Sequence, residues 1–258
     1  MTVPFSKKNI LGIDITDASE KEVLEYIVHF LKTGGKKLFI TTPNPEILVY
    51  AKHHKPFADI LNSADISLPD GVGVVVASVF LGKNLKNRVP GVDFMKNLCE
   101  KSLEQPITVG FLGGRPGVAL KAAECLKREF PGLRILLSEG GNPDGETAEM
   151  IKDLRLKIKD LPAGKGGFRG IDILFVGFGF PKQEQWIYNH LDELPVRVAM
   201  TVGGGFDIFS GSLRRAPSLV REVGLEWLWR LILQPWRIKR QLALVEFIWL
   251  VFKERIKR

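Results

Sequence analysis

The first 211 residues alternate short, β-branched apolar runs with longer amphipathic segments, and this alternation limits the possible folds most strongly. It is typical of βα units whose strands form a mostly parallel sheet. One run, Ile173–Val176, is apolar at every position, which indicates a strand covered on both faces. The sequence therefore predicts an α/β protein in which helices flank a mostly parallel sheet.

The segment boundaries follow from the same pattern and from capping residues such as Asn44 before Pro45. The predicted strands are Lys37–Thr41, Ile66–Leu68, Ile107–Leu112, Arg134–Leu137, Ile171–Val176 and Arg197–Val202. The predicted helices are Glu20–Leu31, Pro45–His53, Val72–Leu81, Val92–Leu103, Pro116–Phe130, Glu146–Lys159 and Lys182–Leu191. A glycine-rich stretch, Leu161–Gly170, is expected to be a flexible loop.

The C-terminal stretch Ser212–Arg258 has a different composition. It holds eleven Lys or Arg and four Glu, whereas the preceding residues hold 26 basic and 25 acidic side chains. Four of the five tryptophans also fall in this stretch. We therefore expect two units: a nearly neutral domain over residues 1–211 and a basic, Trp-rich helical appendage over residues 212–258.

Two helices are predicted in the appendage, Ser218–Leu233 and Trp236–Ile256, separated at Gln234-Pro235. The longest uncharged run of the second, Phe247–Phe252, is far shorter than the ~20 apolar residues of a membrane-spanning helix. Aromatic and basic residues together favour an amphipathic helix lying in the bilayer interface. The alternative is that the appendage packs on the body or on another subunit. Nucleic-acid binding is a weaker candidate, because the appendage is too apolar for a purely electrostatic groove.

The rest of the composition narrows the class of protein. Two cysteines, Cys99 and Cys125, are too few for a disulfide framework and indicate reduced, intracellular residues in helix cores. The start, Met1–Ile10, is polar and does not have the pattern of a secretory signal.

Five loops that follow predicted strands carry most of the candidate functional residues. In a doubly wound sheet such loops lie at the edge where ligands bind. Three of them are glycine-rich, which favours a nucleotide or diphosphate ligand, although glycine in such turns can be purely conformational. None matches the P-loop pattern, and the turn at Gly113 lacks the dinucleotide spacing. The loops are Thr41–Asn44, Leu68–Gly73, Leu112–Gly117, Gly177–Gln183 and Val202–Asp207.

Asp70 is the carboxylate best placed for chemistry in these loops. It follows an apolar strand and precedes a helix, which suits a general base, but Pro-Asp-Gly is also an ordinary turn sequence. Arg88 is a candidate for holding a phosphate, or else a solvated loop arginine. The other polar candidates are Thr42, Asn44, Gln183, Glu184 and Asp207, for which capping or turn formation is the alternative.

Several chemistries have no matching pattern. No D-x-D sequence is present to hold a metal–nucleotide complex, and the four histidines have no metal-ligand spacing with cysteine. A G-x-S-x-G nucleophile elbow is also missing. The remaining candidate is a metal-free displacement on a nucleotide-bearing substrate, with a carboxylate base and an arginine that offsets phosphate charge.

Seven motifs, in order along most of the chain, resemble the WecG/TagA/CpsF family of bacterial glycosyltransferases. They are TPNPE (Thr42–Glu46), LPDGVG (Leu68–Gly73), RVPGVD (Arg88–Asp93), GFPKQEQW (Gly179–Trp186), GGGFD (Gly203–Asp207), RRAP (Arg214–Pro217) and GLEWLWRLILQPWRIKR (Gly224–Arg240). The resemblance implies a Rossmann-like enzyme of cell-surface polysaccharide synthesis, such as assembly of the teichoic acid linkage unit. It further implies inverting transfer from a UDP-sugar to a polyprenyl-diphosphate-linked GlcNAc at the cytoplasmic membrane face, with no metal or other cofactor.

The resemblance also assigns roles to individual residues. Asp70 would be the general base, Thr42, Gln183 and Asn44 would position the substrates, and Arg88 would steady the leaving diphosphate. Asp207, with Gly203 and Gly204, would contact the nucleotide. Gly113 is a further substrate-binding candidate, because its loop and the loop at Leu161 are candidates for selecting the donor sugar. The candidates for appendage cations in the active site are Arg214, Arg215, Arg230 and Arg237.

The sequence leaves the donor sugar open. N-acetylmannosamine is the first expectation, and N-acetylmannosaminuronic acid and glucose are the alternatives. A non-catalytic UDP-sugar sensor held at the membrane by its appendage is a rival from another class, and a protein that binds nucleic acid through this basic appendage is a weaker one. The expected location is the cytoplasm, peripherally associated with the inner face of the cell membrane. A homo-oligomer in water could shelter the apolar appendage.

Overall fold

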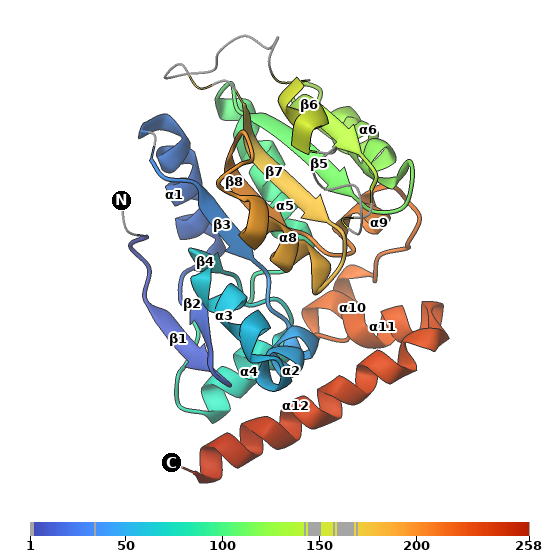
Figure 1. Cartoon of the computed structure of the whole chain (residues 1–258). Helices are drawn as coiled ribbons and strands as arrows, with labels where there is room; N and C mark the ends of the chain where they lie inside the picture. Colours follow the sequence, from blue (N-terminus) through green and yellow to red (C-terminus); the bar gives the residue numbers. More distant parts are fainter. Residues whose placement is uncertain are drawn as a thin grey trace.

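In the computed structural model of this protein, residues 3–33, 35–141, 143, 151–156, 158, 168 and 170–257 are described. Its sheet is built from β3 (Leu38–Thr41), β4 (Ile66–Ser67), β5 (Thr108–Gly113), β6 (Arg134–Glu139), β7 (Ile171–Gly177) and β8 (Val196–Thr201). The spatial order is β4-β3-β8-β7-β5-β6, and every neighbouring pair is parallel (Figure 1). The α/β fold and all six predicted strands are confirmed, to within two residues at each end.

Helices cover both faces of this sheet because its central strands carry apolar side chains on both faces. In β7, Ile173 and Phe175 point into one buried cluster, whereas Leu174 and Val176 point into another. The first cluster packs under α1 (Glu20–Thr33), α5 (Gly91–Lys101) and α6 (Val118–Glu129). The second packs under α8 (Lys182–His190). These predicted helices are confirmed, as are α2 (Pro45–His53) and α4 (Val72–Phe80), and a 3-10 turn, η1 (Ser102–Glu104), extends α5.

Three local elements were not predicted. An antiparallel hairpin pairs β1 (Lys7–Ile10) with β2 (Ile13–Thr16), and its turn places Leu11 and Gly12 at φ of 54° and 95°. Leucine rarely adopts a positive φ, so the usual turn residues gave no signal for this hairpin. The short helices α3 (Lys55–Ser63) and α9 (Gly205–Phe209) were also missed.

One predicted helix and one predicted loop are described only in part. Residues 151–156 are helical, and the rest of the predicted range 146–159 lies largely outside the described residues. Of the expected loop 161–170, only positions 168 and 170 are described.

The appendage contains more elements than the two predicted helices. It comprises α10 (Ser218–Glu222), α11 (Glu226–Leu233), η3 (Pro235–Arg237) and α12 (Ile238–Ile256). The first predicted helix is wrong as a single unit, because Gly224, at φ 77°, interrupts it. A Cβ at Gly224 would lie 2.6 Å from Cγ1 of Val72, so this glycine also permits close contact between the appendage and α4.

The long helix α12 lies across α2 and α4 (Figure 1). Three of its side chains, Phe247, Leu250 and Val251, are buried in a third apolar cluster together with residues of α2 and α4. No helix within the described part of the chain has the length and hydrophobicity needed to cross a membrane.

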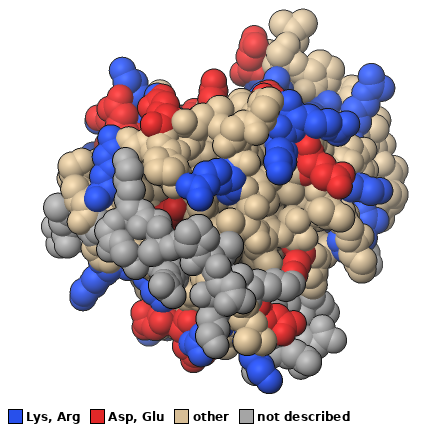
Figure 2. Space-filling view, turned by 90° about the horizontal axis from the view of Figure 1, so that it is seen from above, with Lys and Arg blue, Asp and Glu red and all other residues tan. Residues whose placement is uncertain are grey.

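The far end of the molecule, opposite α12, carries charges of both signs. Figure 2 shows Lys and Arg interspersed with Asp and Glu on this face. The described charges on this face do not gather into a patch of one sign.

Candidate active site

All five predicted loops emerge at one edge of the molecule because the strands that precede them are parallel. The spatial order of the strands arranges these loops along the edge, from the loop after β4, through those after β3, β8 and β7, to the loop after β5. Backbone hydrogen bonds join the first of them. The Asp70 N–H donates to the Pro43 carbonyl at 3.0 Å, and the Val89 N–H donates to the Pro69 carbonyl at 3.0 Å, which brings Arg88 beside Asp70.

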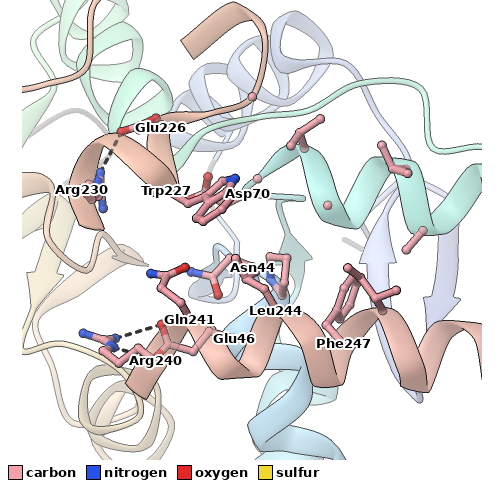
Figure 3. Close-up of a pocket in the computed structure, with 18 of the residues that line it drawn as sticks. Asn44, Glu46, Asp70, Glu226, Trp227, Arg230, Arg240, Gln241, Leu244 and Phe247 are labelled. Carbon is pink, nitrogen blue, oxygen red and sulfur yellow. Dashed lines mark hydrogen bonds and ion pairs between the residues drawn. The ribbon is translucent and has the colours of Figure 1, made fainter. Parts of the chain in front are cut away.

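A cavity of about 860 Å³ lies between these loops and the appendage (Figure 3). One side is formed by the loops after β3 and β4 and by α4, and the other by α11 and α12. The structure thus brings together five of the residues predicted from sequence: Asn44, Asp70, Arg88, Arg215 and Arg230. Asn44 also caps α2, since its Oδ1 accepts from the Ile47 N–H at 3.1 Å.

The Asp70 carboxyl lies at the polar end of this cavity, facing Trp227 in Figure 3. Its pKa is raised from 3.8 to about 6, chiefly by burial and also by the neighbouring Glu226. Arg230 and Arg88 act in the opposite direction, as does a hydrogen bond from the Gly91 N–H. The carboxyl is thus a stronger base than an exposed aspartate and is still mostly ionised at neutral pH.

Among the described side chains, four arginines line the cavity, and each has a carboxylate partner. Arg88 and Arg230 share one partner, Glu226, at 3.5 Å and 2.9 Å. Because two guanidinium groups face a single glutamate, the second positive charge is offset by the Asp70 carboxylate and becomes available to an anionic ligand when Asp70 takes up a proton. Arg88 is held further by donation from its Nη1 to the Arg221 carbonyl at 2.9 Å.

The other two arginines are anchored at different places. Arg215 contacts Asp93 on α5 at 2.7 Å. Arg240 forms a two-pronged pair with Glu46 at the start of α2, at 2.6 Å and 3.1 Å (Figure 3). These pairs hold the appendage against the body at the mouth of the cavity.

Sequence reasoning missed several lining residues, namely Glu46, Glu226, Trp227, Arg240 and Gln241. All five lie inside or next to the motifs of the family resemblance, so the motifs contained them. Nothing in their spacing indicated that they would face Asp70. Among the named appendage arginines, Arg214 is not among the lining residues, and the side chain of Arg237 lies outside the described part of the structure.

A second group of predicted residues lies along the edge over β5, β7 and β8, outside the cavity lining. Gly113 at the end of β5 has φ 112°, and a Cβ there would meet the Gly177 carbonyl carbon at 2.8 Å. Gly203 has φ 51°. Gly204 precedes α9, and Asp207 on α9 faces Arg115 at 3.5 Å.

Gln183 joins two of these loops from the interior. Its Oε1 accepts from the Gly203 N–H at 3.1 Å, and its Nε2 donates to Glu184 Oε1 at 2.8 Å. Thr42 is also buried, and its hydroxyl donates to the Thr201 carbonyl at 3.4 Å. In the structure, both side chains hold neighbouring loops together.

Glu184 is the most unusual member of this group. Its side chain is buried, and burial raises its pKa from 4.5 to about 7, although the hydrogen bond from Gln183 lowers the pKa. Its Oε2 has no hydrogen-bond partner among the described residues. No sequence pattern indicated that this carboxyl is internal, because a glutamate in the first turn of a helix is normally a solvated capping residue.

No group of three His, Cys, Asp or Glu side chains in the described ranges is arranged to hold a metal ion. The cations at the site, as far as the structure describes it, are the arginines.

The parallel sheet, the glycine-rich edge and the cavity with a base and arginines are features of an enzyme that transfers a group from a phosphorylated donor. The comparison with protein families is more specific. Residues 8–258 match the model described as "Glycosyl transferase WecG/TagA/CpsF family", and the chain belongs to this family of glycosyltransferases.

Two characterised relatives have the same printed name, N-acetylglucosaminyldiphosphoundecaprenol N-acetyl-beta-D-mannosaminyltransferase. The one from Bacillus spizizenii (strain W23) is 35% identical over 244 residues, which are 93% of this chain and 90% of that protein. The one from Staphylococcus aureus (strain MRSA252) is 32% identical over 253 residues, which are 98% of this chain and 94% of that protein. The resemblance inferred from the motifs is confirmed.

Proposed function

We propose that this glycosyltransferase moves N-acetylmannosamine from a UDP donor to the GlcNAc of a polyprenyl-diphosphate-linked acceptor, with inversion and without a metal. The observation that carries the proposal is the Asp70 carboxylate beside the Arg88–Glu226–Arg230 group, inside a cavity that also has an apolar side. The names of the two relatives support the sugar and the acceptor.

In the proposed reaction, Asp70 removes the proton from an acceptor hydroxyl. The resulting oxygen attacks the anomeric carbon, the bond from that carbon to the diphosphate breaks, and UDP leaves on the opposite face. An in-line displacement of this kind inverts the anomeric centre. With a pKa of about 6, roughly nine tenths of Asp70 is ionised at pH 7 and able to accept the proton.

The arginines account for the proposed independence from metal ions. A leaving diphosphate needs positive charge, and preorganised cations in a site shielded from water stabilise such charge effectively. Arg88 and Arg230 share one carboxylate, so they are able to donate hydrogen bonds to phosphate oxygens, and Arg215 lines the same cavity. The side chain of Arg237 remains a further candidate.

The glycine-rich edge is proposed to hold the nucleotide. Gly113, Gly203 and Gly204 have no side chains, so a ligand can approach the backbone of this edge closely. Asp207 is the candidate for contacting the nucleoside. Thr42 and Gln183 act by fixing these loops, through Thr201 and Gly203. In this arrangement, residues 1–211 supply the donor site and the base, and residues 212–258 supply cations and the second wall.

The appendage is proposed to bind the inner face of the cell membrane. Its exposed apolar side chains include Ile232, Trp236, Trp249 and Ile256, between 56% and 73% exposed, which is unusual for so many large residues on neighbouring helices. Basic residues on the same elements favour anionic lipid surfaces. We also predict that these residues are covered by oligomerisation in water. Sedimentation with and without lipid tests this prediction.

The test is UDP release in EDTA from a panel of UDP-sugars, with a polyprenyl-diphosphate-GlcNAc analogue as acceptor. We expect acceptor-dependent release with UDP-N-acetylmannosamine and a fall of about 10²–10⁴ for Asp70→Asn. The control Asp59→Asn, an exposed aspartate on α3, keeps wild-type turnover. The kcat/KM should also fall below pH 6, as Asp70 becomes protonated.

Three results would contradict this proposal in different ways. Near-wild-type turnover of Asp70→Asn would exclude Asp70 as the base. Release only after Mg²⁺ is added would exclude the metal-free mechanism. Tight UDP binding without turnover of any donor would favour the sensing module instead.

A further inference from the structure

The cavity has two chemically different ends. Its polar end holds Asp70 and the arginines, whereas its other end runs between α4 and α12 and is lined by apolar side chains. We call this apolar end the α4–α12 groove, and its walls are Val76, Ala77 and Phe80 of α4 and Val245, Ile248 and Phe252 of α12. Figure 3 shows these two helices running side by side away from Asp70.

The groove is open, although its residues are of the kind that normally pack. Val76, Val245 and Ile248 are 60%, 67% and 68% exposed. They recur at helical spacing on the faces that the two helices turn toward one another, so their exposure is systematic. At the far end, the rings of Phe80 and Phe252 stack with centroids 6.2 Å apart.

The floor of the groove is closely packed by other side chains of the same two helices. Phe247 and Val251 of α12 are buried against α2 and α4. A Cβ at Gly73 on α4 would meet Pro45 Cγ at 2.9 Å, so α4 and the start of α2 touch below the groove. Nothing among the described residues covers its open side, and exposed apolar surface of this extent marks a binding site.

We propose that the α4–α12 groove binds the isoprenoid chain of the acceptor, with its sugar at Asp70 and its diphosphate at the polar end of the cavity, between the sugar and the groove. This inference rests on the proposed function and names the subsite that recognises the lipid. A nucleotide sugar has no hydrocarbon to fill the groove, whereas a prenyl diphosphate has an anionic head and an apolar chain in the same order as the two ends of the cavity. The relatives are named for an undecaprenol-linked acceptor.

The length of the groove determines how much of the isoprenoid chain it can hold. From Val72 to Phe80 the helix α4 rises about 12 Å, at 1.5 Å per residue, so only the isoprene units nearest the diphosphate fit in the groove. The remainder of the chain extends past Phe80 and Phe252. Discrimination between acceptors is therefore expected to depend on these first units and to level off as the chain is lengthened.

A matched pair of substitutions on α4 tests the groove. Val76 and Val79 lie on one helix and are 60% and 58% exposed, but Val76 lines the cavity and Val79 does not. In detergent solution, Val76→Asn is expected to raise the KM for a long-chain prenyl-diphosphate-GlcNAc acceptor about tenfold, since it removes apolar contact with the chain. Val79→Asn should leave this KM unchanged.

Two further measurements isolate the contact between the groove and the prenyl chain. With a GlcNAc-diphosphate acceptor carrying only a methyl group, both variants should have wild-type KM and kcat, because no chain reaches the groove. Equilibrium binding of undecaprenyl diphosphate, followed by intrinsic tryptophan fluorescence, to which Trp227 on the cavity wall contributes, should weaken about tenfold for Val76→Asn alone. Val245→Asn, on the opposite wall, should act in the same way as Val76→Asn.

The outcomes distinguish this proposal from the one on which it rests. If undecaprenyl diphosphate binds with this selectivity but no sugar is transferred, the reaction is wrong and the groove is correct. If both α4 variants weaken binding equally, the surface contacts detergent or bilayer lipid without selecting the prenyl chain. If Val76→Asn impairs the methyl acceptor as strongly, its effect is on the structure of the site, and the groove is excluded.

Discussion

The edge over β5, β7 and β8 and the cavity beside α12 are built in contrasting ways. The edge consists of backbone at positive φ and of interior side chains, such as Gln183, that bond neighbouring loops. The cavity consists of charged and apolar side chains from segments as distant in sequence as Glu46 and Arg240. In the proposed function, the nucleotide site is therefore made from local turns, whereas the site for the base, the diphosphate and the hydrocarbon chain requires separate parts of the polypeptide to meet.

The largest expected effect that separates the two regions is on catalysis. Arg230→Gln removes a cavity cation and should lower kcat/KM for transfer about 10²-fold or more. Arg230 lowers the pKa of Asp70 and Glu226 raises it. The acid limb of the pH–rate profile should therefore move to higher pH in Arg230→Gln and to lower pH in Glu226→Gln.

These opposite displacements are the control for a general loss of structure, which would not produce them. Arg128→Gln, on the exposed side of α6, should change neither rate nor profile. If both cavity variants moved the profile in one direction, the assignment of the charges around Asp70 would be wrong.

The next effect concerns the edge and its backbone. Gly113→Ala places a Cβ 2.8 Å from the Gly177 carbonyl carbon at φ 112°, and we expect a loss of about 2–4 kcal/mol in the free energy of unfolding. Gly117 also has a positive φ, 80°, but a Cβ there meets nothing within 4 Å. Gly117→Ala should cost only about 1 kcal/mol, and urea denaturation compares the two.

This pair distinguishes crowding from backbone strain. Equal losses at the two glycines would mean that the positive φ alone matters and that the strands do not approach as closely as described. A loss confined to Gly113→Ala would establish the close contact between the loops after β5 and β7.

The smallest effect comes from the carboxyl buried beneath the edge. Since the pKa of Glu184 is raised in the folded protein to about 7, its contribution to stability is fully present below pH 4.5 and is lost as the pH rises through 7. Glu184→Gln keeps an acceptor for Gln183 and cannot ionise. At pH 9 it should be more stable than wild type by up to about 3 kcal/mol, and at pH 4 the two should be equal.

Chemical denaturation across this pH range measures the difference. The exposed Glu124→Gln on α6 is the control and should follow the wild type throughout. If Glu184→Gln gave a constant offset at all pH values, its effect would come from packing and not from the ionisation of residue 184.

Much of the edge could be predicted from sequence because its determinants are local. Strand–turn–helix patterns located β3 to β8 and the glycine-rich loops between them, and parallel pairing required these loops to meet. The same reasoning gave Asp70 its place before α4. The positive-φ Leu11 shows the limit, since a hairpin without ordinary turn residues was missed.

The cavity could be predicted only in part. The charge and tryptophan content marked the appendage, and Arg215 and Arg230 were named, but Arg240, Glu226 and Trp227 were not. Their roles depend on how α11 and α12 pack across α2 and α4, and helical periodicity does not determine such a long-range arrangement. Likewise, Glu184 was expected at a solvated helix start, and tertiary packing buries it.

The long separation between the two walls of the cavity also bears on the order of folding. Arg240 and Glu46 are 194 positions apart in the sequence. Bringing them together costs conformational entropy of the polypeptide between them, and this cost is small only after most of that polypeptide has folded. The sheet and its edge can form without that closure. Partial opening that releases α12 would then remove one wall of the cavity while the glycine-rich edge persists, so we expect the complete cavity to be lost by this local event before the protein unfolds globally.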